Sequence, residues 1–460
     1  MLVEFTVGNF RSILEPQTLS MVAAKTVAKN KLLDQENVFE ANGVRLLKTA
    51  ALYGANSSGK SNIIKALRFM QRQLRRFTLR RDVDAEDQID VEPFLLDSTS
   101  ALRPSHFEVV FITNQTQYRY GFDATHERIV AEWLYYVPEQ RETLLFKRDG
   151  DTYDLRSVFK KEGDKLQERT RENRLYLPVV SEFNGHIARE VIDWFARLRI
   201  DSGLRETFRA RSTERILDPR SPEAFKRDMV LDLLRSLNLG FDDVSVEREK
   251  VEGDVVAERS LSPVSVDQQS LIPQPETNRA ISQAPARRLT FEALRTRTVH
   301  RSNDGDQKVL FDLVKQESDG TQRVFALAGE IVDVLTRGGV MVVDEMDARL
   351  HPILTRNLVQ LFNSSQANPR NAQLVFATHD TNLLTNQLFR RDQIWFIEKD
   401  QQQASRLYAL SEFKGVRNDA SFEKDYILGR YGAIPFLGDL RDMLDSPKAI
   451  AQNGETAPDE

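Results

Sequence analysis

Gly54-Ala55-Asn56-Ser57-Ser58-Gly59-Lys60-Ser61 fits the pattern G-x-x-x-x-G-K-[ST] at every defined position. It follows an apolar run at residues 46–53, which we predict to be a strand, and it precedes apolar residues spaced as on one face of a helix. Those residues are Ile63, Ile64, Leu67, Met70 and Leu74. A strand, a glycine-bounded loop and a helix in this order predict a cradle for phosphate groups, the alternative being a glycine-rich turn that fits by chance.

The residue types in this segment suit the binding of a nucleotide. Gly54 and Gly59 let the backbone wrap around anionic oxygens, so that N–H groups and the positive end of the following helix point at phosphate. Lys60 supplies a positive charge for the β- and γ-phosphates, and the Ser61 hydroxyl can bind Mg²⁺. We therefore expect ATP and Mg²⁺ as cofactors. The predicted ATP-binding residues are Gly54, Asn56, Ser57, Ser58, Gly59, Lys60, Ser61 and Asn62.

A second acidic motif completes the predicted nucleotide site. The run Val340-Met341-Val342-Val343 reads as a buried strand and ends in Asp344 and Glu345. Beside a phosphate cradle this is a Walker B pattern, in which Asp344 binds the Mg²⁺ and Glu345 is the base that orients the attacking water. A strand that simply ends in solvated acids is the alternative.

The composition limits the other classes of site. The chain has 460 residues, 40% of them hydrophobic, which is enough for two or three domains with substantial cores. No run approaches the roughly 18 apolar residues of a membrane span and no signal peptide opens the chain, so we expect a cytoplasmic protein without membrane contact. Zero cysteines exclude disulfides and thiolate metal sites, and six scattered histidines form no zinc cluster.

The charge is dense and nearly balanced. The chain has 64 Lys and Arg against 69 Asp and Glu, a net charge of −5, which argues against a protein that binds nucleic acid over its whole surface. Local basic segments occur at residues 72–81 and 197–215. They favour either a solvated helix face or contacts with DNA, and both interpretations stay open.

Further motifs resemble those of ABC-type ATPases. Residues 317–322 (ESDGTQ) are similar to their signature motif, residues 347–352 (DARLHP) to their D-loop, and residues 374–380 (LVFATHD) to the strand that ends in their switch histidine, here His379. The wide spacing of these motifs resembles the split head of SMC, Rad50 and RecF-like proteins. The opening F-x-x-x-N-F-R-S-I and residues 422–437 resemble ATPases of prokaryotic abortive-infection and phage-defence systems, the OLD group and the RloA/AbiL type.

This resemblance implies a mechanism shared between chains. The signature residues Ser318, Asp319, Gly320 and Thr321 of one subunit would close on ATP held by Lys60 of another, giving a head-to-tail homodimer or a higher homo-oligomer. The alternative for ESDGTQ is a simple helix N-cap. Asp319 stands where transporters have glycine and Thr321 where many have glutamine, and no Q-loop glutamine is identifiable. The two signature changes suggest slow turnover, and the missing Q-loop together with the large insert disfavours a transporter.

The resemblance also implies a function. About 80 residues follow His379, too few for the Toprim nuclease domain of OLD proteins, so the effector would be a separate chain and a nuclease. We therefore expect an ATPase that senses or gates such an effector in phage defence. The alternative is a RecF- or Rad50-like ATPase of DNA repair or DNA structure, with the arginine-rich segments on DNA.

The fold class that follows is α/β: a P-loop NTPase head of the ABC type with an antiparallel β-flap and an inserted, mainly helical segment. We expect an ATPase N-lobe at 1–150, a helical insert at 151–300 with a mobile loop at 251–288, an ATPase C-lobe at 301–440 and a disordered tail at 441–460. The remaining expectations are local. They are strands at 2–14, 106–112, 117–122, 129–137, 244–249, 289–300, 393–397 and 407–410, irregular chain at 15–45, a helix at 186–199, and a helix opened by Ser221-Pro222-Glu223 with the stripe Phe225, Met229, Leu233 and Leu237.

Overall fold

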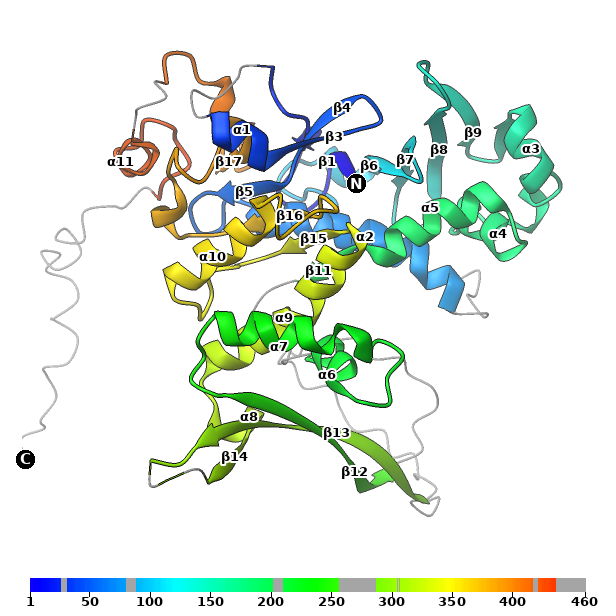
Figure 1. Cartoon of the computed structure of the whole chain (residues 1–460). Coiled ribbons are helices and arrows are strands. Elements are labelled where there is room, and N and C mark those ends of the chain that lie inside the picture. The colour runs from blue at the N-terminus through cyan, green and yellow to red at the C-terminus, as the bar shows by residue number, and fades with distance from the viewer. Residues whose placement is uncertain are drawn as a thin grey trace, which may run out of the picture. The chain divides into compact units, whose positions relative to one another are not determined.

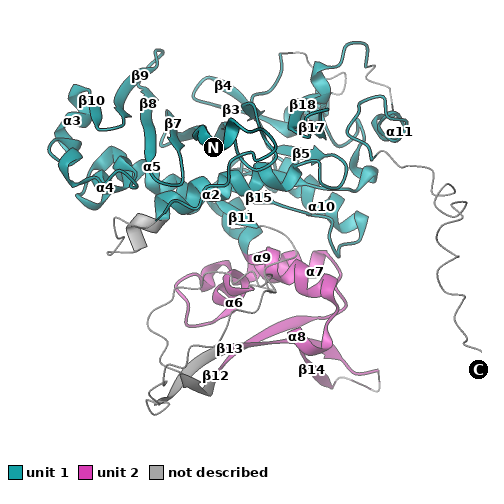
Figure 2. Ribbon diagram, turned by 180° about the vertical axis from the view of Figure 1, so that it is seen from behind, with its two compact units in different colours: residues 1–207, 330–460 teal, residues 208–329 magenta. Residues whose placement is uncertain are grey.

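A computed structural model describes residues 1–25, 31–79, 88–201, 210–255, 287–303, 305, 307–416 and 421–435. The chain forms two compact units, Met1–Thr207 with Glu330–Glu460, and Phe208–Gly329 (Figure 2). We call them unit 1 and unit 2 and describe each by itself. The division falls within one long helix, α9 (Asp319–Arg337).

A six-stranded sheet forms the centre of unit 1 (Figure 1). Its order is β11 (Arg199–Asp201), β15 (Val340–Val343), β16 (Gln373–Ala377), β5 (Thr49–Tyr53), β17 (Ile394–Lys399) and β18 (Ser405–Ala409). All neighbours are parallel except β17 and β18. Every residue of β5, β15 and β16 is buried, as expected of central strands covered on both faces. Residues 49–53 of the strand predicted before the glycine-rich segment, and the strand predicted at 340–343, are therefore confirmed as core strands of one sheet.

A seven-stranded antiparallel sheet is the second layer of unit 1. Its order is β10 (Thr152–Leu155), β9 (Thr143–Asp149), β8 (Ile129–Val137), β7 (Thr116–Ala124), β6 (Ser105–Thr113), β1 (Leu2–Gly8) and β2 (Gln17–Ser20). Alternate residues such as Phe107, Val109 and Phe111 are buried, which matches the period-2 pattern of a half-buried sheet. The predicted meander is confirmed, and it is larger than expected because β1 and β2 join one side and β9 and β10 the other.

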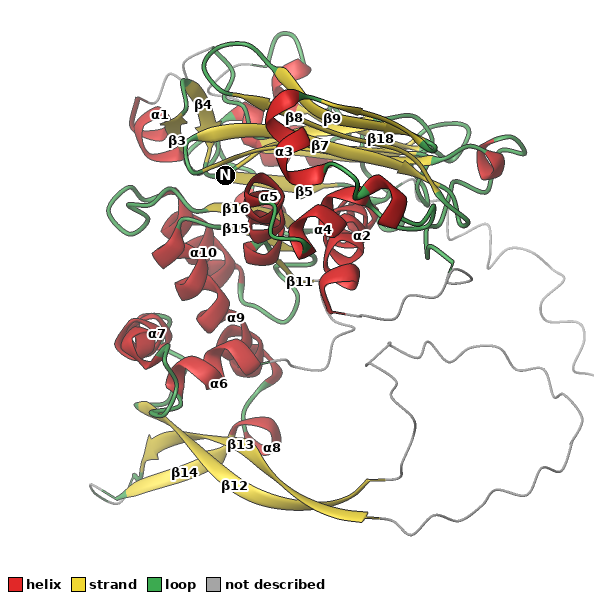
Figure 3. Ribbon diagram, turned by 90° about the vertical axis from the view of Figure 1, so that its right-hand side faces the viewer, coloured by secondary structure: helices red, strands yellow, loops and turns green. Residues whose placement is uncertain are grey.

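Helices fill the space next to this sheet (Figure 3). They are α2 (Lys60–Leu79), α3 (Ser157–Gly163), α4 (Tyr176–Glu182) and α5 (His186–Arg197), and α10 (Pro352–Asn363) packs on β5 and β16 of the parallel sheet. Apolar residues of α2, α4 and α5 share one buried cluster with both sheets. The predicted helix at 186–199 is confirmed as α5, with Val191 and Phe195 fully buried. Short 3₁₀ turns occur at η1 (Ser100–Leu102), η2 (Gln167–Arg169), η4 (Thr381–Leu383), η5 (Arg391–Gln393) and η6 (Leu410–Glu412), and α11 (Phe422–Ile427) is the last described helix.

The expectation of irregular chain at residues 15–45 is wrong. After β2, this part forms α1 (Lys31–Asn37) and a hairpin of β3 (Val38–Ala41) and β4 (Val44–Leu47). Asn42 and Gly43 take positive φ angles of 50° and 73°, as a two-residue hairpin turn requires. The apolar run at 46–53 also breaks at Lys48 into β4 and β5, because the Lys48 amide bonds the carbonyl of Asn37 rather than a strand neighbour.

Unit 2 combines a three-stranded sheet with helices. The strands are β12 (Asp243–Val255), β13 (Arg287–Arg301) and β14 (Lys308–Asp312), and the helices are α6 (Arg211–Leu217), α7 (Arg227–Ser236), α8 (Leu313–Gln316) and the first part of α9, with a 3₁₀ turn at η3 (Ala224–Lys226). The strands predicted at 244–249 and 289–300 are confirmed and are longer. Residues 251–255 and 287–288 of the expected mobile loop are therefore strand, and 256–286 lie outside the described residues, as does the expected tail at 441–460.

The helix expected after Ser221 begins later than predicted. A 3₁₀ turn precedes it, and α7 itself starts at Arg227. Because this turn shifts the helical phase, Phe225 and Met229 are 77% and 47% exposed instead of buried. The buried face consists of Val230, Leu231, Leu234 and Leu237. With these corrections, the α/β class, with an antiparallel sheet beside a parallel one, is confirmed. The inserted segment combines its helices with the long strands β12 and β13, so it is less helical than predicted.

Candidate functional site

Three of the predicted motifs emerge from one edge of the parallel sheet. β15, β16 and β5 are consecutive neighbours, with Val343 opposite Phe376 and Ala377 opposite Leu52. The residues that follow these strands therefore leave the sheet together at its carboxyl edge, where ligands of open α/β sheets bind. They are Asp344 and Glu345 after β15, His379 after β16, and Gly54 after β5.

The two glycines of the phosphate cradle occupy positions where no other residue fits. A Cβ on Gly54 would lie 2.3 Å from the carbonyl oxygen of Ile397, and one on Gly59 would lie 2.2 Å from Oγ of Ser405. Gly59 also has φ of +112°, which side-chain-bearing residues rarely adopt. The loop is thus packed against the ends of β17 and β18 as tightly as its backbone allows.

Lys60 is held inside the cradle. It is 7% exposed, and its Nζ donates to the carbonyl oxygens of Gly54 at 2.7 Å and Ala55 at 3.0 Å. Burial lowers the pKa of Lys60 to about 8, although Asp344, Asp347 and Glu345 nearby act to raise it. The ammonium group is therefore poised for an anionic partner that would relieve its desolvation.

Ser61 and Asp344 meet at the start of α2. The Ser61 hydroxyl hydrogen-bonds the Asp344 carboxyl group, and the Asp344 amide donates to the carbonyl of Asp201 at 2.9 Å. Asp344 is 5% exposed, and its Oδ1 is buried without a hydrogen-bond partner. Burial is the main cause that raises the pKa of Asp344, and the neighbouring Glu345 adds to it.

This pair fits the predicted Mg²⁺. A buried carboxylate oxygen that lacks a partner beside a hydroxyl supplies the hard oxygen ligands that Mg²⁺ prefers, and the nucleotide's phosphates and water normally supply the others. Within the described residues no cluster of three or more His, Cys, Asp or Glu could hold a metal ion by itself. The residues present thus suit a metal that arrives with a nucleotide.

His379 and Asp347 are joined through the backbone. The His379 amide donates to both carboxylate oxygens of Asp347 at 3.3 Å. Burial, and next the charge of Lys60, lower the pKa of His379, so its imidazole is neutral at pH 7. Glu345, one residue beyond Asp344, takes a positive φ of 49°, a strained backbone conformation of the kind that clusters at functional sites.

A cavity of about 760 Å³ opens on the cradle. Its lining includes Asn56, Ser57 and Ser58 of the cradle, His379, and Tyr426 of α11. The contribution of the C-terminal segment was not predicted. Tyr426 stacks on Phe396, with 5.4 Å between the ring centroids, and this contact holds the segment in place. The contact could not be predicted, because aromatic residues that pack in this way form no sequence motif.

Two serines outside the predicted set support the cradle. Asn62 donates from Nδ2 to Oγ of Ser12 at 2.7 Å. Oγ of Ser405 donates to the carbonyl of Ser58 at 2.6 Å and lies 2.7 Å from Oγ of Ser12, whose proton it can accept. Ser12 belongs to the opening motif F-x-x-x-N-F-R-S-I, so the sequence contained a signal for its role. No local pattern distinguishes Ser405 from other serines.

The signature-like residues lie in unit 2, where they start α9. The amide of Thr321 donates to Oγ of Ser318 at 3.1 Å, and the two hydroxyls lie 2.9 Å apart. Asp319 and Gly320 form the first turn of the helix. Ser318 is therefore an N-cap, and this geometry is compatible both with a simple cap and with a helix end that binds an anion.

Among the described residues, we find no helix with the length and apolar composition that crossing a lipid bilayer requires.

Three comparisons relate this chain to known proteins. No curated protein matches the sequence. A solved SMC head bound to the C-winged helix domain of ScpA is 12% identical over 89% of this chain and 97% of its own, with a TM-score of 0.40. An SMC head domain from Thermotoga maritima is 13% identical over 89% and 98%, with a TM-score of 0.36. A family model matches residues 50–385, from the strand before the cradle to beyond His379, and the chain belongs to the family described as "AAA domain, putative AbiEii toxin, Type IV TA system".

Proposed function

We propose that this protein is an ABC-type ATPase in which ATP joins two copies head to tail, and that this assembly gates a separate effector, a nuclease, in phage defence. The observation that carries the proposal is the arrangement around Asp344. A buried carboxylate oxygen without a partner, the Ser61 hydroxyl and the Lys60 ammonium converge at the start of α2, directly after the cradle loop. This combination suits a metal-bound triphosphate better than any uncharged ligand.

Each residue of the site has a role in hydrolysis. Lys60 would exchange the carbonyl oxygens of Gly54 and Ala55 for the β- and γ-phosphates. Ser61 and Asp344 would hold Mg²⁺, which neutralises charge on the phosphates when bound. Glu345 would accept the proton of the water that attacks the γ-phosphorus as the bond to the ADP oxygen breaks. His379, neutral and close to Lys60, would donate a hydrogen bond to the γ-phosphate or to that water.

The second half of the proposed site comes from another copy. Ser318 caps α9, and the amide groups of the first turn of that helix offer a positive end for the γ-phosphate of the partner's ATP. ATP would then act as a clamp between copies, and its hydrolysis would release them. The family's association with a type IV toxin–antitoxin system supports a role in defence, and the separate effector rests on the resemblance to defence ATPases described above.

The alternative, a RecF- or Rad50-like ATPase on DNA, gains little from the basic segments. Arg199 pairs with Asp333 at 3.0 Å, and Arg215 with Glu223 at 2.7 Å. These two carboxylates reduce the net positive charge that the second segment offers to a DNA backbone. Residues 80 and 81 and 202–209 of these segments lie outside the described residues.

The assembly of two copies can be measured by light scattering. With a non-hydrolysable ATP analogue and Mg²⁺, we expect the mass to rise from the 52.8 kDa of one chain to that of two. Ser318→Arg places a large cation on the sealing helix end, and it should bind the analogue but stay monomeric. A wild-type protein that stays monomeric at saturating analogue would contradict the proposal.

The affinity for ATP should fall as the pH rises above 8. Without ligand Lys60 has a pKa of about 8, and bound phosphates would raise it, so binding above pH 8 requires uptake of a proton. Affinity is therefore fully present below pH 8 and drops by up to about tenfold per pH unit above it. Isothermal titration calorimetry between pH 7 and 9.5 measures this, and Lys60→Arg, which stays charged throughout, should remove the slope. An equal slope in both proteins would exclude Lys60 as its source.

A further inference from the structure

A second cavity of unit 1, of about 470 Å³, lies away from the phosphate cradle. Val340, which lines it, begins β15, whereas Asp344 follows the last residue of that strand. The second cavity and the Asp344 carboxylate are thus at opposite ends of the same parallel strand. The volume is within the roughly 300–1,000 Å³ of sites for small ligands.

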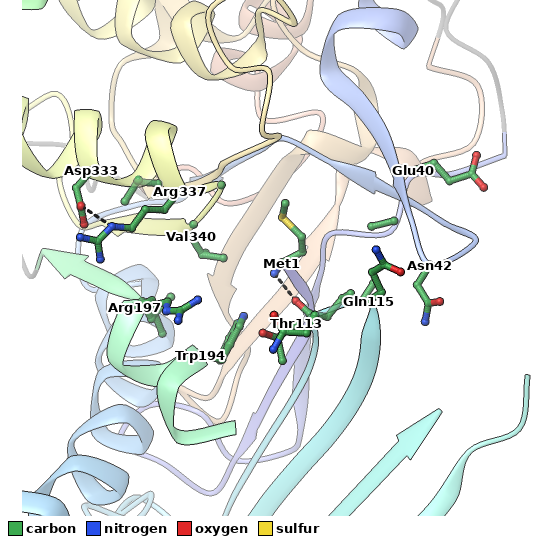
Figure 4. A pocket seen from close by; sticks show the side chains of 17 residues that line it. Met1, Glu40, Asn42, Thr113, Gln115, Trp194, Arg197, Asp333, Arg337 and Val340 are labelled. Atoms are coloured by element: carbon green, nitrogen blue, oxygen red, sulfur yellow. Dashed lines mark hydrogen bonds and ion pairs between the residues drawn. The ribbon is translucent and has the colours of Figure 1, made fainter. Parts of the chain in front are cut away.

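The cavity has a cationic side. Arg197 at the end of α5 and Arg337 at the end of α9 both line it, together with Trp194 (Figure 4). Buried Asp333 accepts from Nε of Arg337 at 2.9 Å and from Nη2 of Arg199 at 3.0 Å, so two guanidinium groups neutralise it. In the part of the chain that the structure describes, Arg197 has no carboxylate within ion-pair distance. An anionic group on a ligand would give it one.

The opposite side consists of hairpin tips that carry amides. Asn42 comes from the β3–β4 turn and Gln115 from the β6–β7 turn, and both lie across the cavity from Arg197 (Figure 4). Gln115 has φ of 63°, a conformation that costs a residue other than glycine or asparagine about 1 kcal/mol or more. Asn114 also has a positive φ of 44°, and the two-residue turn between β6 and β7 requires this conformation at both residues. Glu40, the other acidic residue of the lining, points its carboxylate away from the centre.

An apolar wall lies between these two sides. Trp194 stacks on Phe111, with ring centroids 4.2 Å apart, and Ile112 and Val340 extend the same wall. A flat ring can lie against such a wall, while side-chain amides read its edge as asparagine and glutamine do with adenine. Guanidinium groups are the side chains best suited to a phosphate.

We propose that this cavity binds a nucleoside monophosphate, with the phosphate at Arg197 and Arg337, the base along the Trp194 wall and its edge toward Gln115. The proposal is independent of the proposed ATPase, because no residue of the phosphate cradle lines this cavity. It gives the protein a second nucleotide-binding position, one strand length from the carboxylates of the first.

The test uses adenosine monophosphate in isothermal titration calorimetry on full-length Lys60→Ala protein, in which the phosphate cradle is disabled. We expect binding to persist. Adding Arg197→Ala should weaken it by about 10- to 100-fold, the effect of a lost charged hydrogen bond. Arg189→Ala removes an exposed arginine from the same helix outside the cavity lining and should change nothing.

A variant that fills the cavity tests the binding of adenosine monophosphate without changing any charge. A Cβ at Gly339, in the lining, meets no atom closer than 3.7 Å, so Gly339→Met can be accommodated by the fold while filling the cavity. We expect it to abolish binding of adenosine monophosphate with an unchanged melting temperature. The proposal is overturned if Lys60→Ala protein does not bind the probe, or if both added substitutions leave binding unchanged. ATP binding by the single variant Arg197→Ala should equal that of wild type, which separates this result from the proposed ATPase.

Discussion

Glu345→Gln is expected to slow ATP hydrolysis by about 10²- to 10⁴-fold, the range that a positioned general base contributes. Glutamine has nearly the shape of glutamate but cannot take a proton from the attacking water. Asp344, Ser61 and Lys60 stay in place, so ATP should bind as in wild type. Because hydrolysis is the proposed release step, the variant should accumulate as dimers with ATP itself, without a non-hydrolysable analogue.

The measurement is the steady-state release of phosphate, with light scattering on the same samples. Glu127→Gln is a matched control, since it removes the charge of an exposed glutamate between β7 and β8 in the same unit. It should hydrolyse ATP at the wild-type rate. If Glu345→Gln turns over like this control, another group activates the water and Glu345 is not the base.

The elements that sequence predicts well are those whose patterns are set by local rules. Buried strands such as β15 appear as unbroken apolar runs, and α5 and α9 show apolar residues at helical spacing. The glycine-rich segment could be placed because each of its positions has a separate steric or electrostatic requirement. Gly54 and Gly59 meet theirs in the structure through close contacts with Ile397 and Ser405.

Other parts of the fold depend on contacts that are distant in sequence. The segment at 15–45 has no strong period, and its hairpin forms where Val22 and Ala23 meet Leu46 and Arg45 across the chain. The stripe expected on α7 is wrong at Phe225 and Met229, because one 3₁₀ turn changes which face is buried, whereas Leu237 is buried as predicted. Such a turn changes the phase of a whole helix without changing its composition.

The residues of the candidate site also divide into those that a local motif predicts and those that depend on contacts distant in sequence. Lys60, Ser61, Asp344 and His379 were predicted from motifs, and the structure brings them to one edge of the sheet. Ser405 was not, because its role comes from hydrogen bonds to residues hundreds of positions away. The signature residues raise a different question, since contact with a second chain has to be tested between chains.

Mixing two inactive variants addresses that question. Lys60→Ala should lose ATP binding, because the only ammonium inside the cradle is removed, and Ser318→Arg should bind ATP without closing. Each alone is expected to hydrolyse ATP at less than about one hundredth of the wild-type rate, in line with loss of transition-state contacts to phosphate. Lys60 belongs to unit 1 and Ser318 to unit 2 of the same chain.

In a head-to-tail heterodimer of these variants, one site combines both defects and the other combines neither. Free exchange at equal concentrations makes half of the dimers mixed, so about a quarter of wild-type activity should return if the two sites act independently. The matched comparison is a mixture of Lys60→Ala with a chain that carries both substitutions, which contains no intact site and should stay inactive. If the first mixture is as inactive as the second, while native mass spectrometry shows that mixed dimers form, Ser318 does not act on the ATP of its partner. In that case ESDGTQ is the N-cap of α9 and nothing more.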